Sequence, residues 1–365
     1  MEKSLYFEYV QKYYPQLVLA IVEKLNSSKN PLTYLFKQLL TLTYSVDGRW
    51  QSISGTYTRV AADVVAMDSP LPLKKRDSLA KVTGDIPKLG MELFLNEKQM
   101  SDIDAMLAMG LDVNTIVAKI FEDTPRVIEG IYERLEAMFL EGLSTGVALA
   151  LGTEESGGNV GAGIRVTYGY NEDNQFKVKT LWSTPTTATP IDDIKEVLKK
   201  VQKDGRRVVK AYADKTAIDA FNACQSVREQ FAFIQGFVGS KIPILSEAQA
   251  VQVFQTQFGF PVEIVDRSVI TEKNGVQTAK KPWKDGTIVF VTSAKVGSLV
   301  WTRLAEMNHP VAGVSYQTAD NYILVSKYRE NRPALREYTT SQARVLPVIA
   351  NPDGIYTLDT KQAGK

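Results

Sequence analysis

Two side chains suited to nucleophilic or acid–base chemistry occur once each in the sequence, Cys224 and His309. Cys224 ends the helical pattern Asp-Ala-Phe-Asn-Ala-Cys and has no histidine near it in sequence. We therefore expect a small buried side chain rather than a nucleophile. His309 lies in Met-Asn-His-Pro, a turn signal, so we expect it in a surface turn. A Ser-His-Asp triad would have to use His309, and the usual zinc sites need more histidine and cysteine than the chain holds.

Two pairs of adjacent carboxylates could support paired acid–base chemistry, Asp192-Asp193 and Glu154-Glu155. The aspartates follow Thr189-Pro190, which opens a predicted helix. Acidic side chains in a first helical turn are favoured by the helix dipole, so the end of the helix explains this pair without catalysis. An α/β enzyme that uses one of the two pairs remains one hypothesis.

The stretch from Gly152 to Gly163 is dense in glycine, as are loops that cradle phosphates. It follows a predicted helix and enters a predicted strand, whereas a dinucleotide-binding loop follows a strand and opens a helix. No Gly-Lys-Ser/Thr follows it. We expect a flexible connector here, and we expect no cofactor site and no metal site in the chain.

The strongest predicted helix begins at Thr124-Pro125, because threonine is a good N-cap and proline suits the first helical position. A single apolar stripe follows at three- and four-residue steps. Its members are Val127, Ile128, Ile131, Leu135, Met138, Phe139 and Leu143. Counted to Leu149, the helix would be about 37 Å long at the standard rise, long enough to be the backbone of a domain.

Residues 46–96 alternate like β-structure between two helical regions. A long two-stranded excursion has too little apolar surface to be stable by itself in water. We therefore expect it to project and to lie on something else, in the first place another copy of the chain. Lys74, Lys75 and Arg76, at or near its tip, are candidates for contact with acidic groups of that copy.

Residues 1–45 are expected to form an N-terminal arm of two helices. Tyr9 and Tyr13 lie one helical turn apart and are its candidate contact residues. Two interpretations stay open. The arm is either a helical hairpin docked on the body or an arm that grips a neighbouring subunit.

The remaining chain mixes strands and helices. Residues 164–182 predict a β-hairpin around the turn at 171–174. Residues 205–312 alternate strands and helices and predict a compact α/β or α+β unit. Asn351-Pro352-Asp353-Gly354, between two β-runs, is a strong turn signal.

The composition is that of an ordinary globular protein, with 44% hydrophobic and 23% charged residues. The formal net charge of +2, from 43 basic and 41 acidic residues, argues against a dedicated nucleic-acid binder. Any contact with nucleic acid should be weak and salt-sensitive. No secretory signal is visible. The longest apolar run, Leu17 to Val22, is too short to cross a bilayer, so we expect no membrane partner.

In this order the parts resemble the major capsid proteins of tailed bacteriophages, specifically the lambda-type capsid protein E family with the Hong Kong 97-type fold. The segment that carries the resemblance best is Ser341-Gln-Ala-Arg-Val-Leu-Pro-Val-Ile-Ala-Asn-Pro-Asp-Gly-Ile-Tyr-Thr-Leu358. It is similar to the family's ending of a short strand, a Pro-containing turn and a last strand. Phe258-Gly-Phe-Pro-Val-Glu-Ile-Val-Asp266 and the later Trp283-Lys-Asp-Gly-Thr-Ile-Val-Phe-Val291 resemble the family's axial-domain passage.

The resemblance implies an α+β phage major capsid fold in five segments. These are an N-terminal helical arm (1–45), an extended β-loop (46–96), a peripheral domain (97–204) with a spine helix (124–149), an axial domain (205–312) and C-terminal strands of the peripheral domain (313–365). It implies a non-enzymatic protein that self-assembles, as hexamers and pentamers, into the icosahedral head shell around double-stranded DNA.

The same resemblance implies portal, scaffolding and decoration proteins as partners, with weak non-specific contact to packaged DNA. The protein would be found in the virion, after assembly in the host cytoplasm. An encapsulin-like nanocompartment shell, which shares the fold and encloses cargo enzymes, is the alternative.

Overall fold

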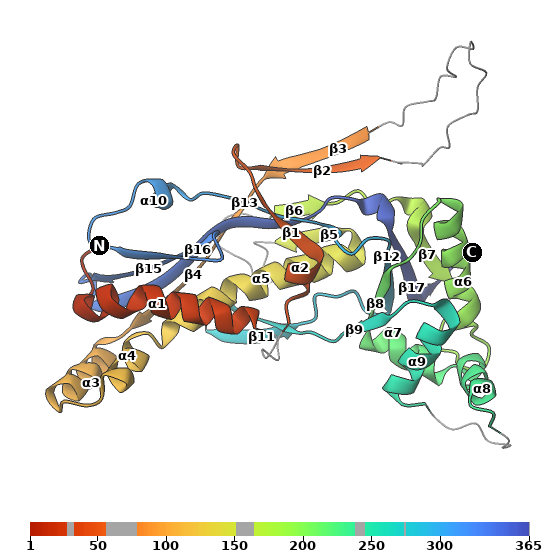
Figure 1. Cartoon of the computed structure of the whole chain (residues 1–365), viewed down its shortest axis with the longest axis horizontal. Helices are drawn as coiled ribbons and strands as arrows, with labels where there is room; N and C mark the ends of the chain where they lie inside the picture. The colour runs from red at the N-terminus through yellow and green to blue at the C-terminus, as the bar shows by residue number, and fades with distance from the viewer. Residues whose placement is uncertain (28–32, 56–78, 151–163, 238–244, 274, 365) are drawn as a thin grey trace, which may run out of the picture. The chain divides into compact units, whose positions relative to one another are not determined.

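A computed structural model describes residues 1–27, 33–55, 79–150, 164–237, 245–273 and 275–364 (Figure 1). The chain divides into two compact units. Unit 1 comprises Met1–Trp50, Gly84–Glu136 and Leu299–Pro347, and unit 2 comprises Gln51–Thr83, Ala137–Ser298 and Val348–Lys365. The five-segment division expected from the sequence stays a prediction.

The centre of unit 1 is a six-stranded sheet in the order β1-β13-β16-β15-β14, with β4 also paired to β16. The neighbours β14, β15, β16 and β4 are antiparallel. The strand bounds are β1 Leu40–Tyr44, β4 Lys88–Leu95, β13 Gly297–Thr302, β14 Ser315–Ala319, β15 Ile323–Glu330 and β16 Arg336–Ile349.

Unit 1 also contains several helices. Their bounds are α1 Phe7–Asn26, α2 Leu35–Leu39, α3 Glu97–Ala108, α4 Val113–Ile120, α10 Ala305–Asn308 and the first part of α5, Asp123–Thr145. The Ser341 hydroxyl of β16 donates to the Val127 carbonyl of α5 over 2.6 Å. Gly130 allows α5 to approach β4 closely, since a Cβ there would lie 2.5 Å from the sulfur of Met91.

Three predictions about the first half of the chain need correction. The second helix of the arm is only five residues long, because Leu40 already begins β1. The long helix ends at Thr145 rather than Leu149. Gly146 takes a left-handed conformation (φ 76°) that ends a helix, and Val147–Ala150 form β5.

The third correction concerns the β-excursion, which is shorter than residues 46–96. Strands β2 (Arg49–Gly55) and β3 (Leu79–Asp85) form a two-stranded ribbon (Figure 1). Strand β4, the last part of the predicted excursion, folds back and pairs with β16 of its own chain, from Leu95 opposite Glu337 to Lys88 opposite Arg344. Only β2 and β3 therefore remain as the described ribbon.

Unit 2 contains a five-stranded mixed sheet in the order β7-β17-β12-β8-β9. Strand β12 runs antiparallel to β17 and β8, while β17 pairs with β7 and β8 pairs with β9 in parallel. The bounds are β7 Gln175–Val178, β8 Lys210–Asp214, β9 Val262–Val265, β12 Thr287–Val291 and β17 Ile355–Ala363.

Four helices pack on this sheet around one hydrophobic core. They are α6 Pro190–Lys203, α7 Lys215–Ala223, α8 Gln225–Ile234 and α9 Glu247–Phe258. Aromatic rings run through the core, with centroids 5.9 Å apart for Phe221 and Phe254 and 6.2 Å apart for Phe260 and Phe290. The helical pattern that leads to Cys224 forms part of α7, and α7 and α8 meet at Cys224.

The hairpin predicted over residues 164–182 is wrong. Strand β6 (Ile164–Thr167) pairs with β5, and β7 pairs in parallel with β17. A 3-10 turn, η2 (Glu172–Asn174), lies between β6 and β7. Two smaller elements complete the unit, namely the hairpin of β10 (Val269–Lys273) with β11 (Val276–Lys280) and the 3-10 turn η3 (Pro352–Gly354).

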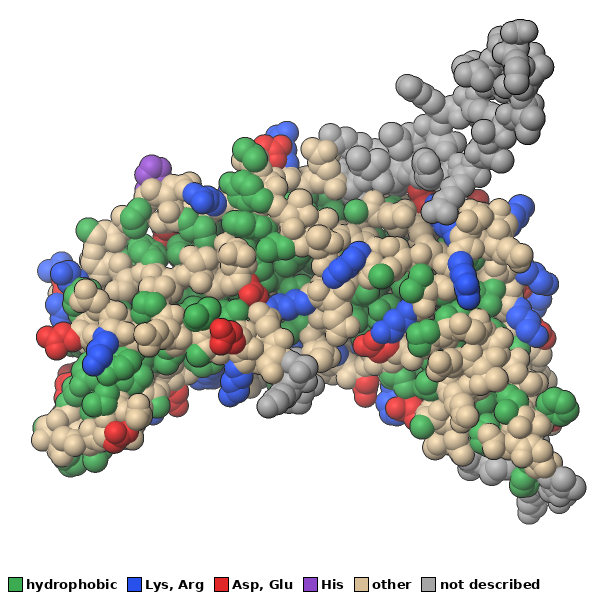
Figure 2. Space-filling view, viewed as in Figure 1, with side chains coloured by type: hydrophobic (Ala, Val, Ile, Leu, Met, Phe, Trp, Pro, Cys, Tyr) green, Lys and Arg blue, Asp and Glu red, His purple; other side chains and the backbone are tan. Residues whose placement is uncertain are grey.

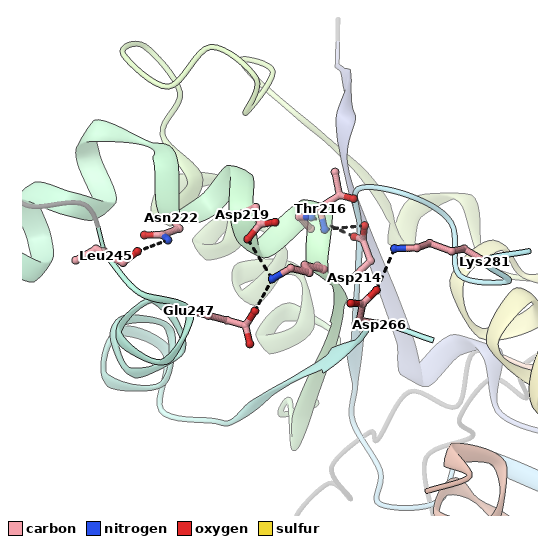
Figure 3. A network of polar contacts seen from close by, with 10 residues as sticks. Asp214, Thr216, Asp219, Asn222, Leu245, Glu247, Asp266 and Lys281 are labelled. Carbon is pink, nitrogen blue, oxygen red and sulfur yellow. Dashed lines mark hydrogen bonds and ion pairs between the residues drawn. The ribbon is translucent and has the colours of Figure 1, made fainter. Parts of the chain in front are cut away.

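A polar network fixes α7 at its start (Figure 3). The Asp214 carboxylate accepts from the backbone N–H groups of Thr216 (3.1 Å) and Ala217 (3.3 Å), as an N-cap does. It also accepts from the N–H of Gly286 over 3.0 Å, which joins α7 to the turn before β12. Lys215 lies 2.7 Å from Glu247 and so joins α7 to α9.

Candidate assembly surfaces

The residues suited to nucleophilic chemistry lie where the sequence predicts. Cys224 is fully buried, and burial raises the pKa of its thiol to about 11. A thiol held protonated in this way is a poor nucleophile, so Cys224 is a packing residue. His309 is exposed and directly follows α10.

The pair Asp192-Asp193 does not form an acid–base site. Asp193 is buried and accepts from the Trp182 indole N–H (2.8 Å) and the Lys179 backbone N–H (3.3 Å). Asp192 is exposed, with Lys195 Nζ 3.9 Å away. The two carboxylates have separate partners, and that of Asp193 also holds the loop before α6, a role beyond the predicted helix-dipole effect.

Some of the residues considered in the sequence for acid–base chemistry or phosphate binding lie outside the described part of the chain. Glu154, Glu155 and the glycine-rich stretch lie outside the described residues. Among the described residues there is no group of three or more His, Cys, Asp or Glu side chains that could hold a metal ion. In the same ranges no helix has the length and apolar character needed to cross a membrane.

The described part of the N-terminal arm is docked on its own unit. Glu2 forms a two-way backbone bridge with Arg329, and the Leu5 N–H donates to Glu337 Oε2 over 3.2 Å. On α1, Val10, Tyr14 and Val18 are buried at four-residue steps. This favours the docked hairpin over an arm that reaches only a neighbour.

Tyr9 and Tyr13 lie on a half-buried side of α1. Their rings stack with centroids 6.3 Å apart and planes 24° from parallel. Lys12 Nζ lies 5.0 Å from the centre of the Tyr13 ring. Part of each tyrosine is therefore available to a neighbouring molecule, and their role as contact residues stays a prediction.

A polar cluster around Asp320 holds the arm in place. Asp320 lies in the turn between β14 and β15 at a left-handed φ of 47°. Its carboxylate lies 2.7 Å from Lys37 Nζ, accepts from Asn26 Nδ2 over 3.1 Å, and accepts from the Tyr132 hydroxyl. One carboxylate thus connects the end of α1, α2 and α5.

The base of the ribbon is tightly packed. Trp50 of β2 is only 4% exposed and lies against Gly84 of β3. The Ile86 N–H donates to the Gly48 carbonyl over 2.9 Å and closes the base. The predicted contact residues Lys74, Lys75 and Arg76 lie outside the described residues.

Three groups of exposed apolar side chains were not predicted as contact sites. They lie at the α3–α4 junction, at the end of α8 and on the β10–β11 hairpin. Figure 2 shows apolar side chains exposed on the molecular surface. The residues are Met109, Leu111 and Val113; Phe233, Ile234 and Phe237; and Ile270 and Val276. The sequence does hint at one of these groups. Phe233 is out of phase with the buried apolar side chains of its helix, α8, which indicates that it is exposed.

The sequence matches the model of one family, described as phage major capsid protein E, over residues 18–360. No curated protein sequence matches the chain.

Many solved structures match this chain, including two with similar folds. A prophage protein of Escherichia coli CFT073, assigned as a capsid protein, is 12% identical with a TM-score of 0.59, over 94% of this chain and 98% of that one. A phage-related protein of Bordetella bronchiseptica RB50 is 10% identical with a TM-score of 0.53, over 95% and 96%. The α+β fold of the Hong Kong 97 type predicted from the sequence is confirmed.

Proposed function

Because this chain belongs to the phage major capsid protein E family, and is a major capsid protein of the head shell, we propose that copies join through the β2–β3 ribbon. A single observation carries the proposal. The ribbon is anchored at its base by Trp50 and Gly84 but has only two strands. Two strands alone are at best marginally stable in water, so a neighbouring copy that covers the ribbon would stabilise it.

The arm supplies a second contact in this proposal. Tyr9 and Tyr13 form a half-exposed aromatic pair on a helix whose other side is docked on unit 1. Aromatic side chains are enriched where interfaces are buried. Lys74, Lys75 and Arg76 are proposed to meet acidic groups of the neighbour.

The five-segment division is part of the proposal. Residues 205–312 would be the axial domain, with α6, β7 and β17 packed on it from the flanking segments. Residues 97–204 and 313–365 would be the peripheral domain, and α5 its spine helix. The support is the core of unit 2, which is formed mainly by residues 208–290 and to which α6, β7 and β17 add side chains.

Assembly as hexamers and pentamers would give a closed icosahedral shell. Repeated contacts between unlike surfaces form a closed assembly only when the rotation between neighbouring copies brings the last copy back to the first. Portal, scaffolding and decoration proteins are proposed partners. The protein would act without catalysis, be assembled in the host cytoplasm and reside in the virion. The family match favours this shell over an encapsulin-like compartment.

Electron microscopy and sedimentation velocity of the purified chain test the proposal. We expect capsomers or closed shells, together with a fast-sedimenting species whose fraction rises with concentration. A compact monomer that persists at high concentration would refute the proposal.

A further inference from the structure

A polar cavity of about 840 Å³ opens in unit 2 beyond the end of α6. It is bordered by the loop after α6, the turn between α9 and β9, and the loop after β12. Its side chains with polar groups are Asp204, Arg206, Arg207, Thr292, Ser293 and Asn351. The α6 side of the cavity carries most of the charge.

The backbone at the end of α6 brings two arginines to this cavity. Gly205 takes a left-handed φ of 69°, and its N–H donates to the Gln202 carbonyl over 3.0 Å. The Arg206 N–H donates to the Val201 carbonyl, also over 3.0 Å. These two bonds form the Schellman motif that ends a helix. The chain therefore turns at a fixed point, and Arg206 and Arg207 line the cavity.

The charge of the cavity lining is net positive, because two arginines and one carboxylate, that of Asp204, line it. Asp204, the acidic lining residue, lies 2.7 Å from Lys200 and accepts from the Tyr356 hydroxyl over 2.7 Å. Arg206 donates to the main-chain carbonyl of Asp353, which is a neutral group. Arg207 is exposed and forms no ion pair within the described ranges.

Two lysines extend the positive surface along α6. Lys199 and Lys203 are one helical turn apart, both are exposed, and neither has an ion-pair partner in the part of the chain that the structure describes. Figure 2 shows Lys and Arg side chains over the region where Figure 1 places α6. The helix dipole explains Lys203 in the last turn but not the arginines beyond it.

We propose that this cavity, together with Lys199 and Lys203 on the helix that ends at it, binds phosphate groups of a nucleic-acid backbone. Arginine offers several N–H donors in a planar fork that suits a phosphate. The Ser293 hydroxyl and the Asn351 amide can add neutral donors. A row of spaced positive charges fits a polyanion better than a single carboxylate. The inference rests on the shell proposed above, which the family resemblance implies to enclose double-stranded DNA.

The test compares two double variants of the full chain with equal loss of charge. Lys203→Gln with Arg207→Gln changes the proposed site. Lys281→Gln with Lys361→Gln is the control, because these lysines are similarly exposed but paired with Asp266 and Asp285. Binding of a duplex of about 30 base pairs is followed by fluorescence anisotropy between about 50 and 200 mM salt.

Loss of two phosphate contacts should make the slope of log K against log salt less negative by about 2 and should weaken binding on the order of a hundredfold at about 50 mM salt. The control should keep the wild-type slope. An unchanged slope in the site variant would overturn the proposal, and so would an equal change in the control, which would mean that only total charge matters.

Competition by inorganic phosphate at constant ionic strength distinguishes a site for free phosphate from a site for the phosphate groups of nucleic acid. Competition with DNA on the wild type, but not on the site variant, supports a phosphate site that nucleic acid uses. Phosphate binding without any DNA binding would overturn the nucleic-acid assignment. Electron microscopy of the same samples keeps the shell proposal separate, since both variants should assemble as the wild type does.

Discussion

The indole of Trp50 lies so close to Gly84 that a Cβ on residue 84 would be 2.7 Å from Nε1. Trp50 is on β2 and Gly84 on β3, so this contact joins the two strands at the base of the ribbon. A side chain at residue 84 would have to displace a large ring that is itself buried. The packing at the base of the ribbon thus depends on a residue without a side chain.

Gly84→Val should disturb the base of the ribbon and reduce assembly. Overpacking of this kind costs typically about 2 kcal/mol. We expect a lower Tm and, by sedimentation velocity, a smaller assembled fraction at equal protein concentration.

The matched control is Asp85→Ala, at the next residue. Its carboxylate is mostly exposed and lies 3.5 Å from Arg49, and such surface pairs contribute little. Asp85→Ala should assemble like the wild type. If Gly84→Val assembled equally well, the packed base would have no part in the contact between copies.

Asp320→Ala should destabilise the arm, because it removes the acceptor shared by Lys37, Asn26 and Tyr132. Hydrogen bonds to a charged group are typically worth about 2 kcal/mol, and we expect a loss of this order in urea unfolding. Asp320→Asn keeps an acceptor and tolerates the left-handed backbone, so it should lose less than half as much. Losses near zero for both variants would show that the carboxylate does not hold the arm.

Tyr13 and Tyr14 are neighbours in sequence, but we expect Tyr14→Ala to affect stability and Tyr13→Ala to affect assembly. Tyr14 is 1% exposed and stacks on Phe121 with centroids 5.6 Å apart, so Tyr14→Ala should cost about 4 kcal/mol in the free energy of unfolding. Tyr13→Ala should change stability little and weaken assembly. Circular dichroism melts and sedimentation separate the two effects, and a Tyr13 variant that assembles normally would remove Tyr13 from the interface.

Cys224 should make stability depend on pH in the alkaline range. Burial raises the pKa of the thiol from 9.0 to about 11, so the folded protein holds this proton more tightly than the unfolded chain. The resulting stabilisation is complete below pH 9.0 and is lost as the pH rises toward 11. Chemical denaturation at several pH values measures this loss, and Cys224→Ala should lack it. An equal pH dependence in that variant would assign the effect to other groups.

Helices could be predicted where neighbouring residues in the sequence alone determine them. The apolar stripe after Thr124 predicted α5, Thr189-Pro190 predicted the start of α6, and burial of Cys224 followed from its helical pattern. The end of α5 was missed because Gly146 carries a left-handed turn that the apolar stripe does not reveal.

Pairings between distant strands could not be predicted in the same way. Strand β4 pairs with β16, and β7 pairs with β17, although each pair is far apart in the sequence. A strand's own alternation shows which face is apolar but not which edge it will join. The excursion was therefore predicted too long, and β6 and β7 were wrongly joined into a hairpin.

The contact residues were the least predictable part of the assembly surface. Tyr9 and Tyr13 follow helical spacing, yet that spacing does not separate them from the buried Tyr14. Exposed Phe233 was visible only as a residue out of phase with its helix. Whether a surface meets another copy depends on a second molecule, which the sequence of one chain does not describe.

Cryo-electron microscopy of the assembled protein tests the central claim most directly. The account predicts closed shells or capsomers in which the β2–β3 ribbon of each copy lies against a neighbouring copy. A ribbon that touches only its own subunit, or a preparation that holds nothing larger than single chains, would contradict it.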